Sequence, residues 1–202
     1  MIANSSLFNN TRLRRSTRQT QRGASLIMVM LILIVVSVLG VGSAQISLMS
    51  ERGARNERDL QVAWQSAEAA LNDAEIEMFP NGAGTRKSEF SNATSFVQDC
   101  GVAGNSVGLC ALNLTGKPAW LTANLEGAGA NTVRFGAFTG RTFAAGGPGI
   151  QPEQAPRYVV EIIPDPGAVD LSDPSAVLYR VTAIGFGSRT DIQVVLQMMY
   201  RI

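Results

Sequence analysis

The sequence RGASLIMVMLILIVVSVL, residues 22–39, joins a cationic leader to a long apolar run. The chain has no acidic residue before Glu51. Positive charge beside an apolar segment marks the side of a membrane that stays in the cytoplasm. The layout therefore predicts that the leader stays in the cytoplasm and that everything after the apolar run is exported. The arginines that precede Gly23 are Arg12, Arg14, Arg15, Arg18 and Arg22.

The apolar run, residues 24–44, is long enough to cross a membrane as a helix, because a helix rises about 1.5 Å per residue and a bilayer core is about 30 Å thick. We divide the chain into a leader (1–23), a transmembrane helix (24–44) and one exported domain (45–202). Two other interpretations remain at this point: an uncleaved signal anchor, or a secretory signal cut before Gln45, which would discard the apolar run.

Beyond the run, apolar residues recur at spacings of three and four, which predicts a one-sided helix over residues 45–79. No proline interrupts the chain from Ala24 to Met78, and Pro80-Asn81-Gly82 then ends the pattern. We expect the apolar stripe to face a core and the polar residues, Glu77 among them, to lie mostly on other faces. The stripe comprises Leu60, Ala63, Trp64, Ala67, Ala70, Leu71, Ala74 and Met78.

The rest of the chain predicts loops followed by strands. Residues 80–131 are rich in small polar residues and are interpreted as a loop-rich region, whereas residues 132–202 predict an antiparallel β-sheet. Its last strand places an apolar row on one face, formed by Ile192, Val194, Leu196 and Met198. The one-sided helix is the natural cover for that face, so we expect a two-layer α+β domain.

Composition bears on chemistry. The chain has no histidine and a formal net charge of +1. The absence of histidine removes the commonest general base and metal ligand. A net charge close to zero gives no reason to expect nucleic-acid binding. We therefore expect no enzymatic activity, cofactor or metal site. An aspartate set (Asp165, Asp170 and Asp173) offers oxygen ligands for calcium, but its spacing differs from that of an EF-hand and aspartates also form turns.

Two further features lie on the exported side. Cys100 and Cys110 predict a disulfide in an oxidising compartment, worth about 3 kcal/mol by the chain-entropy model, the alternative being two free thiols. Arg52, Arg55 and Arg58 follow the apolar run closely. They are placed to meet lipid head groups or acidic residues of neighbouring helices, unless they form only a solvated helix face.

The leader, the apolar helix, its one-sided continuation and the small sheet together resemble a type IV pilin. The closer resemblance is to the PilX group of minor pilins, carried by residues 51–75 and by the tail segments 156–161 and 179–185. It implies that prepilin peptidase cuts between Gly23 and Ala24 and that Ala24 is then N-methylated. It also implies an inner-membrane protein with a periplasmic C-terminal domain before assembly, and a pilus subunit after it. The implied partners are prepilin peptidase, other minor pilins, the major pilin, the inner-membrane assembly platform and inner-membrane lipid.

The chain departs from the pilin pattern at Met28. Major pilins carry a glutamate as the fifth residue after the cut, and in the family this carboxylate is held to neutralise a neighbouring terminal amine. Its absence implies a low-copy subunit that helps to prime pilus assembly at or near the tip, and thereby supports twitching motility, adhesion or aggregation. The alternative is a signal-anchored periplasmic binding domain or adhesin with no role in a fibre.

Overall fold

The computed structural model describes residues 24–79, 84–127, 129–167 and 177–201. Its first element is α1 (Ala24–Met78), a helix of 55 residues. The residue contacts divide the chain into two compact units, Met1–Ser50 and Glu51–Ile202. The helix ends where the sequence predicts, immediately before Pro80-Asn81-Gly82, and its last backbone bond runs from the Phe79 N–H to the Glu75 carbonyl at 2.9 Å.

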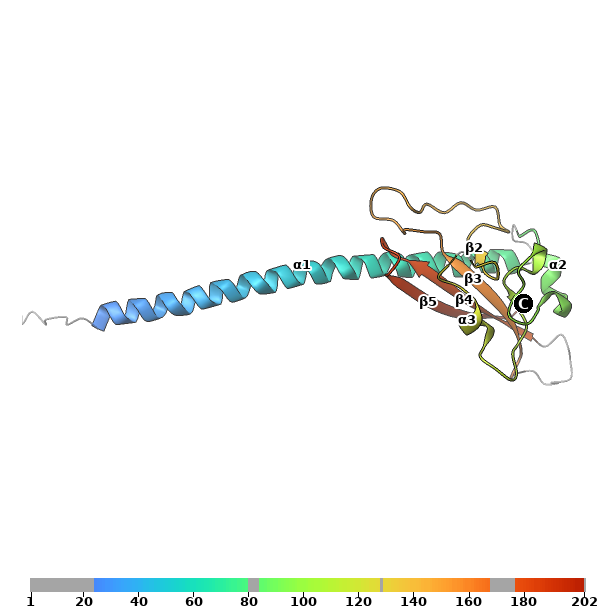
Figure 1. Ribbon diagram of the computed structural model, residues 1–202, viewed down its shortest axis with the longest axis horizontal. Coiled ribbons are helices and arrows are strands. Elements are labelled where there is room, and N and C mark those ends of the chain that lie inside the picture. The colour runs from blue at the N-terminus through green and yellow to red at the C-terminus, as the bar shows by residue number, and fades with distance from the viewer. Residues whose placement is uncertain (1–23, 80–83, 128, 168–176, 202) are drawn as a thin grey trace, which may run out of the picture. The chain divides into compact units, whose positions relative to one another are not determined.

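The second unit contains a sheet of short and long strands in the order β1-β3-β4-β5. Figure 1 labels its three long strands, β3, β4 and β5. The long strands β3 (Arg157–Pro164), β4 (Val177–Phe186) and β5 (Gln193–Tyr200) are antiparallel. The short strand β2 (Val133–Arg134) pairs antiparallel with β3, whereas β1 (Leu109–Cys110) pairs with it in parallel. The predicted antiparallel sheet is therefore confirmed for its long strands, and a two-residue parallel strand makes the whole sheet mixed.

One face of this sheet packs against the second half of α1. Small helix residues line the contact, and Gly185 of β4 shows why. A Cβ atom at Gly185 would lie 2.2 Å from both the Ala63 carbonyl oxygen and the Ala67 nitrogen, so helix and strand approach too closely for any side chain. The core on this face is formed by Ala70, Leu71, Ala74, Met78, Phe90, Phe96, Leu109, Val133, Tyr158, Val160, Tyr179, Val181 and Ala183.

The opposite face of the sheet carries a second apolar cluster that the two-layer prediction did not include. Part of the loop-rich region folds over this face in short elements, and the Cys100–Cys110 disulfide and α3 (Ala119–Thr122) pack there on β3 and β4. The buried members of the cluster are Cys100, Cys110, Ala119, Leu125, Val159, Ile184 and Phe186. The other short elements of this region are α2 (Lys87–Phe90), η1 (Ala93–Ser95) and η2 (Gly104–Ser106).

The prediction that Trp64 belongs to the core is wrong, since its side chain is 49% exposed. It lies one position beyond Ala63, at the border of the stripe, where its indole Nε1–H donates to Glu68 Oε1 at 2.8 Å on the helix surface. The close approach at Gly185 places alanines at the centre of the contact and leaves no space for an indole there.

Candidate assembly helix

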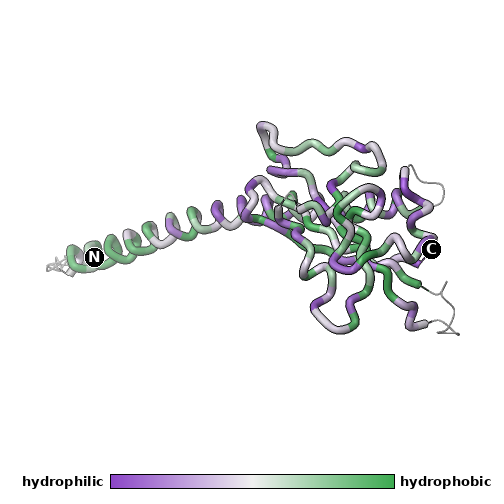
Figure 2. The backbone as a smooth tube through the Cα atoms, turned by 45° about the vertical axis from the view of Figure 1, so that its right-hand side comes forward, coloured by the Kyte–Doolittle hydropathy of each residue, from purple (hydrophilic) through white to green (hydrophobic). Residues whose placement is uncertain are grey.

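The first half of α1 has the surface of a helix that needs apolar surroundings. Residues 24–50 contain no charged side chain, and their large apolar side chains are exposed in the isolated chain. Figure 2 shows this stretch as almost continuously hydrophobic, whereas hydrophilic residues interrupt the helix further along. By length and composition it is a helix able to cross a membrane. The exposed side chains include Leu26, Ile27, Met30, Leu31, Ile34, Val38, Leu39, Ile46 and Leu48.

Two serine hydroxyl groups of this half are satisfied within the helix. Ser37 Oγ donates to the Leu33 carbonyl and Ser43 Oγ donates to the Leu39 carbonyl, both at 2.7 Å. A side chain that bonds to the carbonyl four residues earlier presents no unpaired donor to its surroundings. Since an unpaired polar group is costly in hydrocarbon, these serines are compatible with lipid or with the apolar interior of a fibre.

The predicted processing site lies at the start of this helix. Gly23 falls outside the described residues, and Ala24 is the first residue of α1. Met28, at the position of the family glutamate, is 71% exposed. With no carboxylate anywhere in residues 24–50, this half of the helix cannot neutralise an amine in an apolar environment.

The arginines that follow the apolar run differ in their contacts. Arg55 Nη2 lies 2.6 Å from Glu51 Oε1, one helical turn away, and Arg58 Nε lies 4.0 Å from Asp59 Oδ1. These are exposed pairs of the kind that contribute little to stability.

Two carboxylates on the second half of α1 are buried and hold the sheet and loops to the helix. Asp73 accepts a hydrogen bond from the Gly136 N–H at 2.7 Å and one from Thr139 Oγ1 at 2.6 Å. Arg141 Nη1 lies 3.5 Å from its Oδ1 atom. Asp73 thus fixes the segment that follows β2 onto the helix, and these three partners are all more than 60 positions away in the sequence.

Glu77, one turn further on, forms the most buried ionic contact among the described residues. Both its side chain and that of Arg86 are fully buried; Arg86 Nε donates to Glu77, and the Tyr158 hydroxyl of β3 donates to the same carboxylate. Arg86 also donates to the backbone carbonyls of Asn105 and Val107, and its guanidinium stacks 3.7 Å from the ring centroid of Phe138. We call Glu77, Arg86 and Tyr158 the buried triad.

Burial dominates the protonation of this triad. It raises the pKa of Glu77, although Arg86 and the Tyr158 hydroxyl act in the opposite direction. Burial, followed by the neighbouring Glu77, raises the pKa of Tyr158 well above its usual value, so this phenol keeps its proton. The triad holds the end of α1, the segment around η2 and β3 in one arrangement.

The prediction that Glu77 lies on a polar face is wrong, and the sequence contained the signal that corrects it. Ser66, Ala70, Asp73 and Glu77 follow each other at spacings of four, three and four, which puts them on one helical face. All four are buried. The sequence could not name their partners, because Tyr158 is 81 positions from Glu77.

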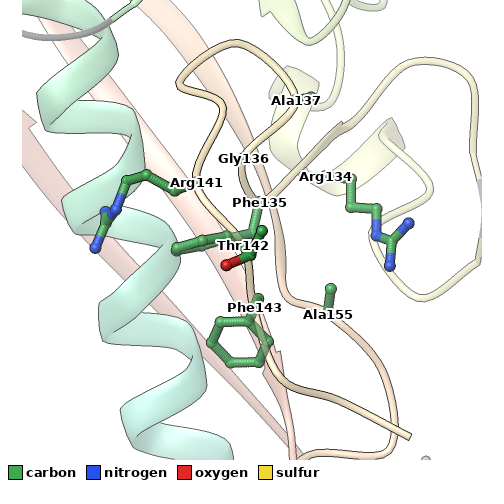
Figure 3. Close-up of a pocket in the computed structure, with 8 residues that line it drawn as sticks. All are labelled: Arg134, Phe135, Gly136, Ala137, Arg141, Thr142, Phe143 and Ala155. Carbon is green, nitrogen blue, oxygen red and sulfur yellow. The ribbon is translucent and has the colours of Figure 1, made fainter.

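Two shallow pockets lie on the second unit. The larger, of about 450 Å³, is lined by the end of β2 and by segments between β2 and β3. Figure 3 shows its two arginines, Arg134 and Arg141, pointing away from each other. Phe135 and Phe143 lie between them, with ring centroids 5.1 Å apart. The smaller pocket, of about 290 Å³, is apolar and lies beside the ends of β3 and β4. Among the described residues, those that line the two pockets include no acid, cysteine or histidine.

The aspartates considered for calcium are described only in part. Asp165 accepts from the Gly167 N–H at 2.8 Å and pairs with Arg201 at 2.6 Å, while Asp170 and Asp173 lie outside the described residues. The Gly167 N–H is the main cause that lowers the pKa of Asp165. Within the described ranges, no group of three acidic or cysteine side chains is arranged to hold a metal ion.

A long apolar helix packed through its second half on a small sheet defines an α+β, pilin-like protein. Two family models match the chain: PilX N-terminal over residues 22–72, and type IV pilus assembly protein PilX C-term over residues 104–202. Together they cover most of the chain, which therefore belongs to the PilX family of type IV pilus assembly proteins. Comparison with curated proteins finds no match, and comparison with solved structures finds none either.

Proposed function

We propose that this PilX-family minor pilin is processed by prepilin peptidase between Gly23 and Ala24, is N-methylated at Ala24, and helps to prime pilus assembly at or near the tip. Before assembly, residues 24–44 hold it in the inner membrane with residues 45–202 in the periplasm. After assembly it forms part of the fibre, together with other minor pilins and the major pilin.

The observation that carries the proposal is the first half of α1. It exposes an uncharged apolar surface on all sides, and a surface of this kind is equally satisfied by lipid tails and by other apolar helices. A helix with these properties can leave the membrane for a fibre without exposing charged groups to an apolar environment. The surface alone suits a fixed membrane anchor equally well, and the match to a family of pilus assembly proteins is what favours the fibre.

Met28 supports the low-copy, priming part of the proposal. A subunit without a carboxylate at this position cannot compensate the terminal amine of a neighbour, and an uncompensated amine in an apolar interior is costly. Such a subunit suits a position at the end of a fibre better than a repeated position within it. Twitching motility, adhesion or aggregation would then depend on it indirectly, through the number of pili formed.

The test is deletion of the gene from the organism that encodes this chain, with surface pili counted by electron microscopy. We expect few or no pili without the chain and normal numbers when it is restored. In sheared pili, quantitative mass spectrometry should find it at a small fraction of the major pilin. Unchanged pilus numbers, or a copy number close to that of the major pilin, would contradict the priming role.

A further inference from the structure

Two arginines lie directly opposite each other where β2 pairs with β3. Arg134 of β2 and Arg157 of β3 are partners in the antiparallel register. The Phe135 N–H donates to the Pro156 carbonyl at 3.0 Å, so these next two residues form a hydrogen-bonded pair. Such pairs alternate with non-hydrogen-bonded pairs, whose Cα atoms are only about 4.5 Å apart. Arg134 and Arg157 form a pair of the second kind, and two like charges therefore lie at the closest spacing that the ladder allows.

The two arginines lie on the face of the sheet that is turned away from α1. Tyr158 belongs to the core that includes α1, whereas Val159 belongs to the second apolar cluster. Since side chains alternate along a strand, Arg157 shares the face of Val159. Figure 3 shows Arg134 extending away from α1, while Arg141 points toward that helix. The charges of Arg134 and Arg157 are therefore presented on one side of the sheet.

Neither of these arginines forms an ion pair with any acid that the structure describes. The other described arginines beyond α1 each lie no more than 3.5 Å from a carboxylate oxygen, and they are Arg86, Arg141, Arg180, Arg189 and Arg201. Like charges directly opposite each other destabilise a sheet. Burial, followed by the charge of Arg134, lowers the pKa of Arg157. The pair thus carries an electrostatic cost that a bound anion would remove.

Neutral groups hold Arg157 in this position. Its Nε donates to Thr132 Oγ1 at 2.8 Å, and its Nη2 donates to the Gly129 carbonyl at 3.3 Å. Thr132 Oγ1 donates to the same carbonyl at 3.0 Å. These contacts fix the guanidinium beside Arg134 without neutralising it, and they leave its Nη1 group available. Arg134 is exposed, and its guanidinium has no acceptor among the described residues. Donors that are already held in place lose little freedom when a ligand binds.

We propose that Arg134 and Arg157 bind a tetrahedral oxyanion that carries two negative charges, a phosphate or a sulfate group. The guanidinium fork matches the oxygen atoms of such a group and forms charge-assisted hydrogen bonds with it. Two facing cations favour a doubly charged group over a single carboxylate. The group can be a free ion or a monoester on a larger molecule, because the binding chemistry is the same. The site goes beyond the proposed role in pilus assembly and does not depend on it.

The test is a titration of the full chain, purified in non-ionic detergent, with sodium phosphate or sodium sulfate. Sodium chloride holds the ionic strength constant, and tryptophan fluorescence follows the melting temperature. We expect both salts to raise the melting temperature of the native chain above its value in chloride. Arg134→Gln should weaken the apparent affinity about tenfold or more, because it removes charge-assisted hydrogen bonds. Arg189→Gln is the matched control, since this exposed arginine already pairs with Asp191, and it should bind as the native chain does.

Stability in chloride separates binding from folding. Without phosphate or sulfate, Arg134→Gln should be at least as stable as the native chain, because it relieves the repulsion between the two arginines. Glycerol 3-phosphate then distinguishes the sources of the group: tighter binding than inorganic phosphate identifies a phosphate monoester, and equal binding identifies the free ion. A native chain that phosphate and sulfate stabilise no more than chloride, or an Arg134→Gln variant with native affinity, would overturn the proposal.

Discussion

The two halves of α1 differ in what their surfaces require. Residues 24–50 carry no charge and expose large apolar side chains, whereas residues 51–78 bury alanines and two carboxylates and expose most of their other polar groups. Within its own chain, the second half finds a sheet, a glycine that admits close approach and partners for its buried acids. The first half requires surroundings that the chain does not supply, which is the property expected of a helix that moves between membrane and fibre.

The largest expected effect is on the free energy of unfolding, and it comes from the buried ion pair between Glu77 and Arg86. Arg86→Met would remove the ionic partner of the buried Glu77 and leave it the hydrogen bond from the Tyr158 hydroxyl. This should lower the free energy of unfolding by about 3–5 kcal/mol at neutral pH. Because the carboxyl group is buried, the loss should shrink at low pH, where Glu77 binds a proton. Denaturant unfolding at several pH values measures both effects.

The double variant Glu77→Gln with Arg86→Met is the control for the Arg86 prediction. It removes the unpaired charge and should recover part of the stability, with little dependence on pH in the acidic range. A single Arg86→Met variant that loses less than about 1 kcal/mol would show that the triad does not hold α1 to the rest of the second unit.

The next prediction places the same new charge, that of an arginine, in each half of α1. Val35→Arg places a guanidinium near the middle of the apolar run and should oppose membrane insertion by about 2.5–3.5 kcal/mol. Gln65→Arg, on the exposed face of the second half, should change stability by no more than about 0.5 kcal/mol. The measurement is the fraction of the chain that stays in the membrane after alkaline extraction, which should be lower for Val35→Arg than for Gln65→Arg. Equal fractions for the two variants would contradict the claim that only the first half of α1 requires apolar surroundings.

A smaller effect is expected at the close approach of helix and strand. Gly185→Ala would place a Cβ 2.2 Å from helix backbone atoms and should destabilise the second unit by about 1–3 kcal/mol. Gly53→Ala is the matched control, because nothing lies within 4 Å of a Cβ there and helix interiors favour alanine by about 0.5–1 kcal/mol. Denaturant unfolding should therefore show a lower free energy of unfolding for Gly185→Ala and a higher one for Gly53→Ala. A Gly185→Ala variant as stable as the native chain would contradict the close packing of helix and strand.

The smallest effect concerns the pH dependence of stability at Glu89, a partly exposed carboxylate of the loop-rich region. Hydrogen bonds from Ser95 and Asn105 lower the pKa of Glu89. The stability that it contributes is present above the ordinary pKa of glutamate, near 4.5, and is lost as pH falls through the lowered value. Ser95→Ala should reduce this acid-dependent loss, and Ser88→Ala, on the exposed surface of α2, should not. Acid unfolding curves that are identical for Ser95→Ala and the native chain would contradict this assignment.

The sequence predicted the elements with strong local signals. The end of α1 followed from Pro80-Asn81-Gly82, and the prediction of an antiparallel sheet over residues 132–202 agrees with the long strands β3, β4 and β5. In contrast, β1 is only two residues long and has no periodicity of its own, so its pairing with β3 could not be predicted. The second apolar cluster was missed for the same reason, since it is assembled from short elements in the loop-rich region.

The side-chain partners were harder to predict than the elements. The regular spacing of Ser66, Ala70, Asp73 and Glu77 marks a buried face, but the groups that satisfy the acids come from distant segments. Trp64 was placed in the core because it belongs to the apolar stripe, while the centre of the contact is set by Gly185 on another element. Sequence periodicity locates a helix face, and the partner decides which residues of that face are buried.

The most direct test of the account is the mass of the mature N-terminal peptide, measured on chain isolated from membranes and from sheared pili. We expect a native chain that begins at N-methylated Ala24, and a Gly23→Val variant that keeps all 202 residues. A native chain that retains Met1 would make it a signal-anchored protein. A chain that begins at Gln45 would make it a secreted one, and either result would contradict the central claim.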